Sequence, residues 1–162
     1  MKLYHGSNQI IKNPDLTKSR KFLDFGSGFY LSTAEKQAEN RAKSAKIFFE
    51  SGTPTINIFE YNGSALNLHV LQFQGADISW LDFIIANRSG ESVSQYDIII
   101  GPTADDKTIL IIDQYMQGMY NNMENPKEIV IKLLQPEKLE IQYLFSTDNA
   151  LNALSFIEAY EL

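Results

Sequence analysis

Residues 24–32 read Asp-Phe-Gly-Ser-Gly-Phe-Tyr-Leu-Ser, two glycines followed directly by an apolar and aromatic run. Glycine allows a tight turn or the close approach of another group to the backbone, and Phe29, Tyr30 and Leu31 favour a strand. The block therefore predicts a glycine-rich turn that leads into a short strand at 29–31. Two interpretations remain open. Either the turn brings the backbone close to a flat ligand, or it is a hairpin in front of a core strand.

The amino terminus predicts a second short strand that ends in a similar way. Residues 2–5 are followed by Gly6 and Ser7. A histidine presents ring nitrogens to a ligand, and a glycine lets the ligand approach the backbone. His5, Gly6 and Ser7 are therefore candidate binding residues, although a His-Gly pair at a strand end can also be a simple turn.

The rest of the chain predicts strands and helices that mix without a regular βαβ order, which favours the α+β class. No linker or internal repeat divides the chain, so we expect one domain over residues 1–162. The hydrophobic patterns and turn residues predict strands at 55–61, 65–71, 96–100 and 139–145. They predict helices at 34–50, at 78–87, from Asp105 or Asp106 to about 119, at about 126–135 (or a strand at 129–134), and from Ser146 or Thr147 onward, with Ala150, Leu151, Leu154 and Ile157 at helical spacing.

The amino-acid composition excludes several kinds of site. The chain has no cysteine, which excludes disulfides, thiolate zinc sites and a cysteine nucleophile, and its two histidines are too far apart to suggest a metal site. No apolar run is long enough for a membrane span and no signal peptide is evident, so we expect a cytoplasmic protein without a membrane partner. The net charge of −6 would repel a polyanion and does not indicate nucleic-acid binding, but residues 1–46 sum to +5 and the remainder to −11. The basic segment can receive a phosphate-bearing ligand, or its lysines can be ordinary surface residues.

Taken together, three blocks resemble the ADP-ribosyltransferase superfamily, whose His-Tyr-Glu signature is shared by diphtheria toxin and poly(ADP-ribose) polymerases. The blocks are Leu-Tyr-His-Gly-Ser at 3–7, Asp-Phe-Gly-x-Gly-Phe-Tyr-Leu at 24–31 and Tyr-Asp-x-x-x-Gly-Pro at 96–102. The chain is most similar to a bacterial family of ADP-ribosyltransferase-like proteins, over nearly its whole length. The resemblance implies two facing, mostly antiparallel sheets with flanking helices and an NAD cleft between them.

The resemblance also implies roles for individual residues. His5 would hydrogen-bond the NAD ribose, the Gly6 backbone would hold the nicotinamide carboxamide, and Tyr30 would stack near the nicotinamide ring; Ser7 and Gly28 would border the same site. Gln142 fits the position of the catalytic glutamate, and Glu140 lies on the same face of the predicted last strand because alternate residues point together. Arg41 stands where some members carry a second stacking aromatic; it can stack and pair with pyrophosphate, or belong to a solvated helix face.

Function follows from the resemblance as an expectation. We expect a mono-ADP-ribosyltransferase of bacterial toxin or defence type that uses NAD as substrate, needs no metal, and has an acceptor macromolecule and an antitoxin protein as partners. Gln142 can form a hydrogen bond but supplies no charge, which leaves a non-catalytic module for NAD or ADP-ribose as an alternative. A second alternative is NAD-dependent RNA 2′-phosphotransfer, which needs several basic residues around the phosphate and is disfavoured by the acidic balance of the chain. Arg88, at the end of a predicted helix, is expected to complement the helix dipole.

Overall fold

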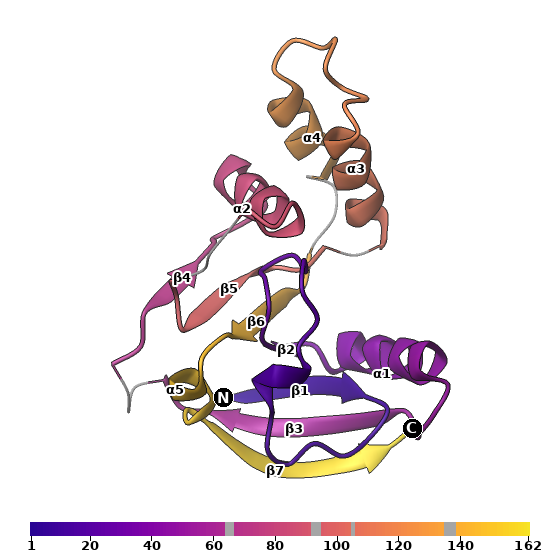
Figure 1. Ribbon diagram of the computed structural model, residues 1–162, viewed down its shortest axis with the longest axis vertical. Helices are drawn as coiled ribbons and strands as arrows, with labels where there is room; N and C mark the ends of the chain where they lie inside the picture. The colour runs from indigo at the N-terminus through magenta and orange to yellow at the C-terminus, as the bar shows by residue number, and fades with distance from the viewer. Residues whose placement is uncertain (64–66, 92–94, 105, 135–138) are drawn as a thin grey trace.

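Seven strands form one hydrogen-bonded sheet at the centre of the computed structural model, which describes residues 1–63, 67–91, 95–104, 106–134 and 139–162 (Figure 1). The strand order is β4-β5-β6-β2-β1-β3-β7, in which β4 and β5 are parallel and every other neighbouring pair is antiparallel. The strands are β1 (Lys2–Ser7), β2 (Phe29–Ser32), β3 (Thr55–Tyr61), β4 (Val70–Gln72), β5 (Ile98–Pro102), β6 (Ile141–Phe145) and β7 (Leu154–Glu161).

Five α-helices surround this sheet in the described part of the chain. They are α1 (Glu35–Phe49), α2 (Ile78–Arg88), α3 (Asp106–Met116), α4 (Pro126–Leu134) and α5 (Asp148–Leu151). Figure 1 shows α1 beside β1, whereas α2, α3 and α4 gather at the opposite end, beyond β5 and β6. The α+β class is thus confirmed. The hydrogen bonding joins the strands in one sheet instead of two facing ones, but β1 and β2 pair only at Tyr4 and Ser32.

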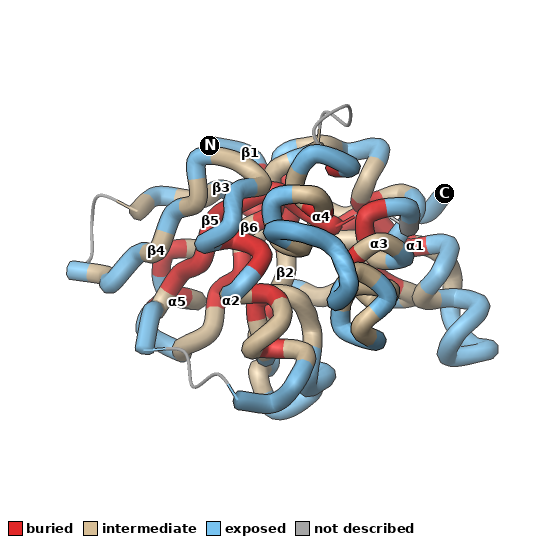
Figure 2. Tube along the Cα trace, turned by 90° about the horizontal axis from the view of Figure 1, so that it is seen from above, coloured by how far each residue is buried: buried red, intermediate tan, exposed pale blue. Residues whose placement is uncertain are grey.

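The buried side chains form clusters on both faces of the sheet. Along β5, Ile99 packs with Trp80 of α2, whereas its neighbours Ile98 and Ile100 pack with Phe29 and Phe145. Successive strand residues point to opposite faces, so a strand that is apolar at every position must be covered on both sides. Figure 2 shows this buried stretch as continuous red along β5.

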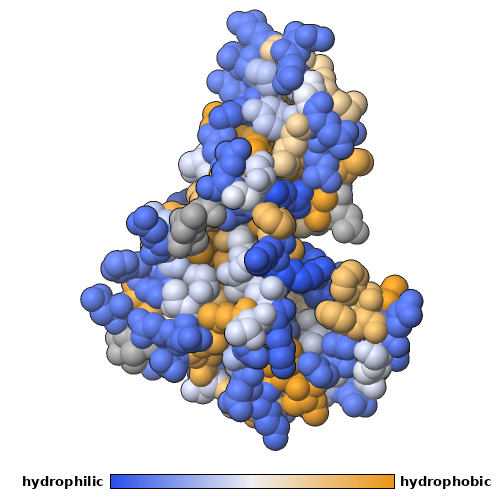
Figure 3. All heavy atoms as spheres, in the orientation of Figure 1, coloured by the Kyte–Doolittle hydropathy of each residue, from blue (hydrophilic) through white to orange (hydrophobic). Residues whose placement is uncertain are grey.

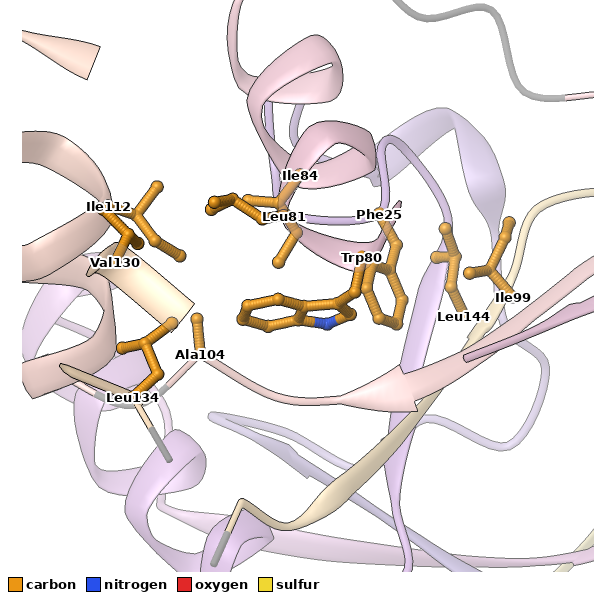
Figure 4. Packing of buried hydrophobic residues seen from close by; sticks show 10 residues of the cluster. All are labelled: Phe25, Trp80, Leu81, Ile84, Ile99, Ala104, Ile112, Val130, Leu134 and Leu144. Carbon is orange, nitrogen blue, oxygen red and sulfur yellow. The ribbon is translucent and has the colours of Figure 1, made fainter. Parts of the chain in front are cut away.

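The cluster around Trp80 anchors the helical end of the molecule. In Figure 4 the indole lies between Ala104 on one side and Phe25 on the other, with Ile112 of α3 beyond. Its Nε1 donates to the carbonyl of Pro102 at 3.0 Å, so the one polar atom of this fully buried side chain is paired. Phe25 thereby fixes the loop in front of β2 to the core.

The prediction of a terminal helix is wrong beyond Leu151. Thr147 does cap a helix, because its side chain accepts from Ala150 N, but α5 ends at Leu151 and residues 154–161 form strand β7. β7 pairs with β3 from Thr55–Glu161 to Tyr61–Leu154, and the ring of Phe156 packs edge-on against Phe59 at 5.7 Å. The free edge of β3 offers backbone partners along its length, and this pairing overrides the helical spacing of the apolar residues.

The remaining elements agree with the predictions, with shifted ends. Residues 126–134 are helical and do not form the alternative strand. The strand predicted at 65–71 is shorter, because β4 begins at Val70; residues 64–66 and Asp105 lie outside the described residues. None of the helices in the described ranges is long and apolar enough to span a membrane.

Candidate functional site

A pocket of about 190 Å³ opens beside the middle of the sheet, and we call it the central pocket. Three of its lining side chains come from three neighbouring strands: His5 from β1, Tyr30 from β2 and Gln142 from β6. Further residues of β1 and β2, the loop before β2, and residues of α1, α2 and α3 complete the lining. Past Tyr4, β1 pairs only with β3 among the described strands, so the sheet parts where the pocket lies.

His5 is held in one tautomer by a single contact. Its Nδ1 lies 2.7 Å from the carbonyl oxygen of Tyr30, which can only accept, so Nδ1 carries the proton and Nε2 keeps a free electron pair. The ring stacks at a tilt of 30° on Phe29, with the centroids 4.2 Å apart. Burial lowers the pKa of His5 to about 4, although the bond to the Tyr30 carbonyl acts in the opposite direction. His5 is therefore a neutral acceptor at pH 7, suited to a ligand hydroxyl and unsuited to the role of a general acid.

The close packing of α1 against β1 requires a glycine at position 6. A Cβ atom at this position would come 1.9 Å from the carbonyl oxygen of Ala38 and 2.7 Å from the amide nitrogen of Ala42, so α1 can approach β1 only because position 6 has no side chain. Ala38 and Ala42 are both buried against the strand. Gly6 also lines the central pocket, at the strand edge that faces β2. The loss of function in a Gly6 variant would therefore not distinguish ligand contact from misfolding.

Tyr30 uses its hydroxyl for the protein and presents its ring to the pocket. The hydroxyl donates to the Gly26 carbonyl at 2.7 Å and accepts from the Phe25 amide at 3.1 Å, which ties down the loop ahead of β2. Burial raises the pKa of Tyr30 far above its ordinary value of 10. The hydroxyl is thus neither free nor acidic, and stacking remains the contact that Tyr30 can offer a ligand.

Gln142 carries a buried amide without a partner. Its side chain is 6% exposed, and Nε2 has no hydrogen-bond partner among the described residues. The neighbouring Gln37 is fully engaged: Oε1 accepts from Ser32 Oγ at 2.5 Å, and Nε2 donates to Thr103 Oγ1 at 2.8 Å. An unpaired buried donor costs about 1–3 kcal/mol, so an acceptor supplied by a ligand would recover that energy.

Of the two remaining predicted site residues, Arg41 lines the central pocket and Glu140 does not. Glu140 is exposed ahead of β6 and does not line the central pocket, so the structure does not bring it together with Gln142. Arg41 is exposed on α1 yet lines the pocket, and it makes no salt bridge within the described ranges. Its guanidinium is therefore available to an anionic ligand.

A second pocket of about 600 Å³ adjoins the first, and we call it the loop pocket. The two share His5, Gly6, Leu23 and Tyr30 in their linings. The loop pocket is also bordered by Ser7, Gly28 and the cations Lys18 and Arg20. A Cβ at position 28 would lie 2.5 Å from the Phe145 carbonyl, so this glycine too is required by the close approach of β6.

A partly buried ion network around Arg88 was missed by sequence reasoning. Its Nε and Nη2 lie 2.8 and 2.7 Å from Asp24 Oδ1, and Nη1 lies 2.8 Å from Asp113 Oδ1. The Arg88 and Asp24 side chains are only 15% and 13% exposed. The network joins the loop before β2 to α2 and α3, and Arg88 and Asp24 both line the central pocket. The dipole role predicted for Arg88 is therefore incomplete; the only signal in the sequence was Asp24 itself, at the start of the glycine block.

The charges of the two pockets favour an anion. Their linings hold four cationic side chains, Arg41, Arg88, Lys18 and Arg20, and two carboxylates. Arg88 pairs with Asp24 and Lys18 with Asp15, which leaves Arg41 and Arg20 without a salt bridge among the described residues. The joined linings thus carry more positive than negative charge in a protein whose net charge is −6.

We expect the stability of the fold to fall as the pH is lowered from about 6.5 toward about 4, because of His5. The unfolded chain takes up a proton on this histidine in that window and the folded chain does not, so protonation favours unfolding. The measurement is urea unfolding at pH 7, 6 and 5. His5→Asn, which keeps a donor for the Tyr30 carbonyl, should flatten the slope between pH 6.5 and 5, whereas His69→Asn at an exposed position should not. An unchanged slope in His5→Asn would contradict a buried neutral His5.

Comparison with known proteins gives one match. A family model described as "Protein of unknown function (DUF3990)" matches residues 1–156. Neither the curated proteins nor the solved structures contain a match to the chain.

Proposed function

The chain belongs to the DUF3990 family, and we propose that it is an NAD-dependent mono-ADP-ribosyltransferase whose reaction takes place in the central pocket. One observation carries the proposal: His5, Tyr30 and Gln142 lie on neighbouring strands and line one pocket. These are the positions that resemble the His-Tyr-Glu signature. In this proposal the sheet, parted between β1 and β2, corresponds to the two sheets of the ADP-ribosyltransferase fold.

The proposal gives each of the strand residues a contact that its chemistry allows. His5 Nε2 accepts a hydrogen bond from a ribose hydroxyl, since Nδ1 is committed to Tyr30. The Tyr30 ring stacks on the nicotinamide, a flat cation that an aromatic face attracts. The open edge of Gly6 receives the carboxamide. All three contacts form in the ground state and therefore contribute to affinity.

The reaction is a dissociative transfer. The bond between the ribose C1′ and the nicotinamide nitrogen breaks, and its electron pair leaves with nicotinamide, which becomes neutral. Positive charge remains on the ribose until a nucleophile on the acceptor gives a lone pair to C1′ and loses a proton to solvent. Gln142 stabilises this state when its Oε1 accepts a hydrogen bond from a ribose hydroxyl; as a neutral amide it is a weaker electrostatic partner than a carboxylate, which predicts slow turnover.

The loop pocket would hold the part of NAD that lies beyond the nicotinamide ribose. Its volume of about 600 Å³ lies within the usual range of ligand sites, about 300–1,000 Å³. Lys18 and Arg20 line it, and Arg41 lines the central pocket. A pyrophosphate between the two pockets would meet these cations.

A second candidate function is supported by the same residues. Gln142 supplies no charge, and the positive field favours ADP-ribose, which lacks the nicotinamide cation, over NAD. A module that binds ADP-ribose or NAD without turnover would have these properties. The two functions differ in one measurable product, free nicotinamide.

The biological setting is proposed on the resemblance alone. We place the enzyme in the bacterial cytoplasm, as a toxin or defence-type protein that modifies a macromolecule and is neutralised by an antitoxin.

NAD is expected to raise the unfolding temperature more than NADH or ATP does. Ligand at a hundred times its Kd stabilises the fold by about 2.7 kcal/mol. Tyr30→Ala should abolish the shift and Tyr30→Phe should keep most of it, because the ring and not the hydroxyl meets the ligand. Tyr160→Ala, at a partly exposed position outside both pockets, is the matched control. Equal shifts with all three nucleotides, or none, would contradict a specific NAD pocket.

A further inference from the structure

Three aromatic side chains near the pockets are exposed to an unusual degree. Phe22, Phe48 and Phe49 are 62%, 66% and 55% exposed. Phe48 and Phe49 end α1, where residues 46–50 are all exposed. Figure 3 shows apolar side chains gathered over this end of the helix. Large aromatic residues are ordinarily buried, so such exposure points to a binding surface.

Cations lie among these rings. The Arg20 guanidinium stands 5.5 Å from the centroid of the Phe48 ring, and the Phe48 and Phe49 rings meet edge to face at 5.0 Å. Lys21 is exposed beside Arg20. Neither of these two cations forms a salt bridge among the residues that the structure describes. We call this set the aromatic-basic surface: Arg20, Lys21, Phe22, Phe48 and Phe49.

The exposed Phe22 ring lies beside the end of α2. The residue has φ of 60°, a left-handed conformation that costs a non-glycine residue about 1 kcal/mol. The ring lies against Gly90, where a Cβ would come 2.8 Å from Phe22 Cε1. The aromatic-basic surface therefore reaches from the end of α1 to the end of α2.

This surface is continuous with the loop pocket. Phe49 and Arg20 belong to both, and the loop pocket shares His5 and Tyr30 with the central pocket. A long ligand seated on the surface would therefore have one end beside the proposed reaction centre.

We propose that the aromatic-basic surface binds a single-stranded polynucleotide, and that this polynucleotide is the acceptor of ADP-ribose. Exposed rings interleaved with cations are the means by which proteins hold single strands, because every base has a face that can stack and every phosphate a charge. Residues 47–162 sum to −11, so the cations that a polyanion could meet are concentrated in residues 1–46, to which Arg20 and Lys21 of this surface belong.

The acceptor class rests on the proposed transferase function. A base nitrogen would give its lone pair to C1′ as nicotinamide leaves with the electron pair of the broken bond, and the nitrogen would lose its proton to water. Binding of the strand itself does not depend on NAD, so the two proposals can fail separately.

The first test is fluorescence anisotropy with labelled 12-nucleotide single strands of DNA and of RNA, and with the duplex. Both single strands should bind more tightly than the duplex, and preference for one reports the sugar of the natural acceptor. Phe48→Ala should weaken binding about tenfold, the effect of losing one stacked base. Lys21→Glu should reduce the slope of log K against log salt by about 0.7 for each lost phosphate contact.

Two control variants change residues of α4 and of the segment between α3 and α4, away from the aromatic-basic surface. Met119→Ala removes an apolar side chain that is 61% exposed, and Lys132→Glu makes the same charge change on α4. Neither should alter binding. Equal losses in the controls, or no binding of either single strand, would overturn the proposal.

The second test incubates the protein with labelled NAD and a mixed extract, followed by nuclease or protease. Label that nuclease removes supports a polynucleotide acceptor, and label that only protease removes overturns it. Nicotinamide release without any acceptor reports the transferase chemistry independently: release with no strand binding would sink the acceptor proposal alone, whereas strand binding with no release would sink the transferase proposal.

Discussion

Gln142→Ala is expected to lower nicotinamide release about a hundredfold while NAD affinity stays nearly unchanged, the loss typical of one hydrogen bond made mainly in the transition state. Gln142 is 6% exposed and lines the central pocket, and the hydrogen bond that its Oε1 accepts from a ribose hydroxyl would strengthen as positive charge develops on the ribose. His5 and Tyr30 supply the ground-state contacts.

The comparison of variants at this strand sharpens that test. Gln142→Glu would place a carboxylate beside the developing positive charge, so we expect hydrolytic release of nicotinamide to rise. Glu140→Gln should change nothing, because Glu140 is exposed outside the central pocket. Gln72→Ala, at an exposed position on β4, controls for loss of a strand glutamine. If Glu140→Gln abolishes turnover, the charge comes from Glu140 and the assignment of Gln142 is wrong.

Arg88→Ala is expected to destabilise the fold by about 3–5 kcal/mol, the cost of leaving a buried charge without its partner. The charge left behind is Asp24, whose side chain is 13% exposed. Asp24 precedes Phe25 and Gly26, which Tyr30 holds through its hydroxyl, so NAD binding should weaken as well. Urea unfolding measures the first effect and the thermal shift with NAD the second.

Two further variants compare the stability contributed by the Arg88–Asp24 ion pair with that of an exposed ion pair. Lys127→Ala breaks the ion pair with Asp82, whose partners are 44% and 47% exposed, and should cost about 1 kcal/mol or less. Arg88→Met combined with Asp24→Asn removes both charges and should cost less than Arg88→Met alone. An Arg88→Ala variant as stable as Lys127→Ala would show that the network does not hold the loop.

Local patterns explain which elements could be predicted. β2 and α1 follow from neighbouring residues: an aromatic run after glycines, and a helix-forming stretch of alanine and lysine. β7 could not be predicted in the same way. Its helical spacing is real, but pairing with β3 across about a hundred residues decides its conformation, and no local signal records that partner.

The residues of the central pocket also divide into those that could be predicted from the sequence and those that could not. The resemblance located His5, Tyr30 and Gln142, and the structure brings them together on adjacent strands. The contacts of Arg88 with Asp24 and Asp113 depend on how α2 and α3 pack, which is set by the cluster around Trp80. Its motif predicts a ligand contact at Gly6. The clash of a Cβ with Ala38 became visible only once α1 was placed on β1.

Release of free nicotinamide from NAD by the purified protein tests the central claim most directly. We predict slow release by the wild-type chain, abolished in Tyr30→Ala and reduced about a hundredfold in Gln142→Ala. NAD that binds tightly to the wild-type chain and to Gln142→Ala, with no nicotinamide released by either, would contradict the transferase and leave a binding module in its place.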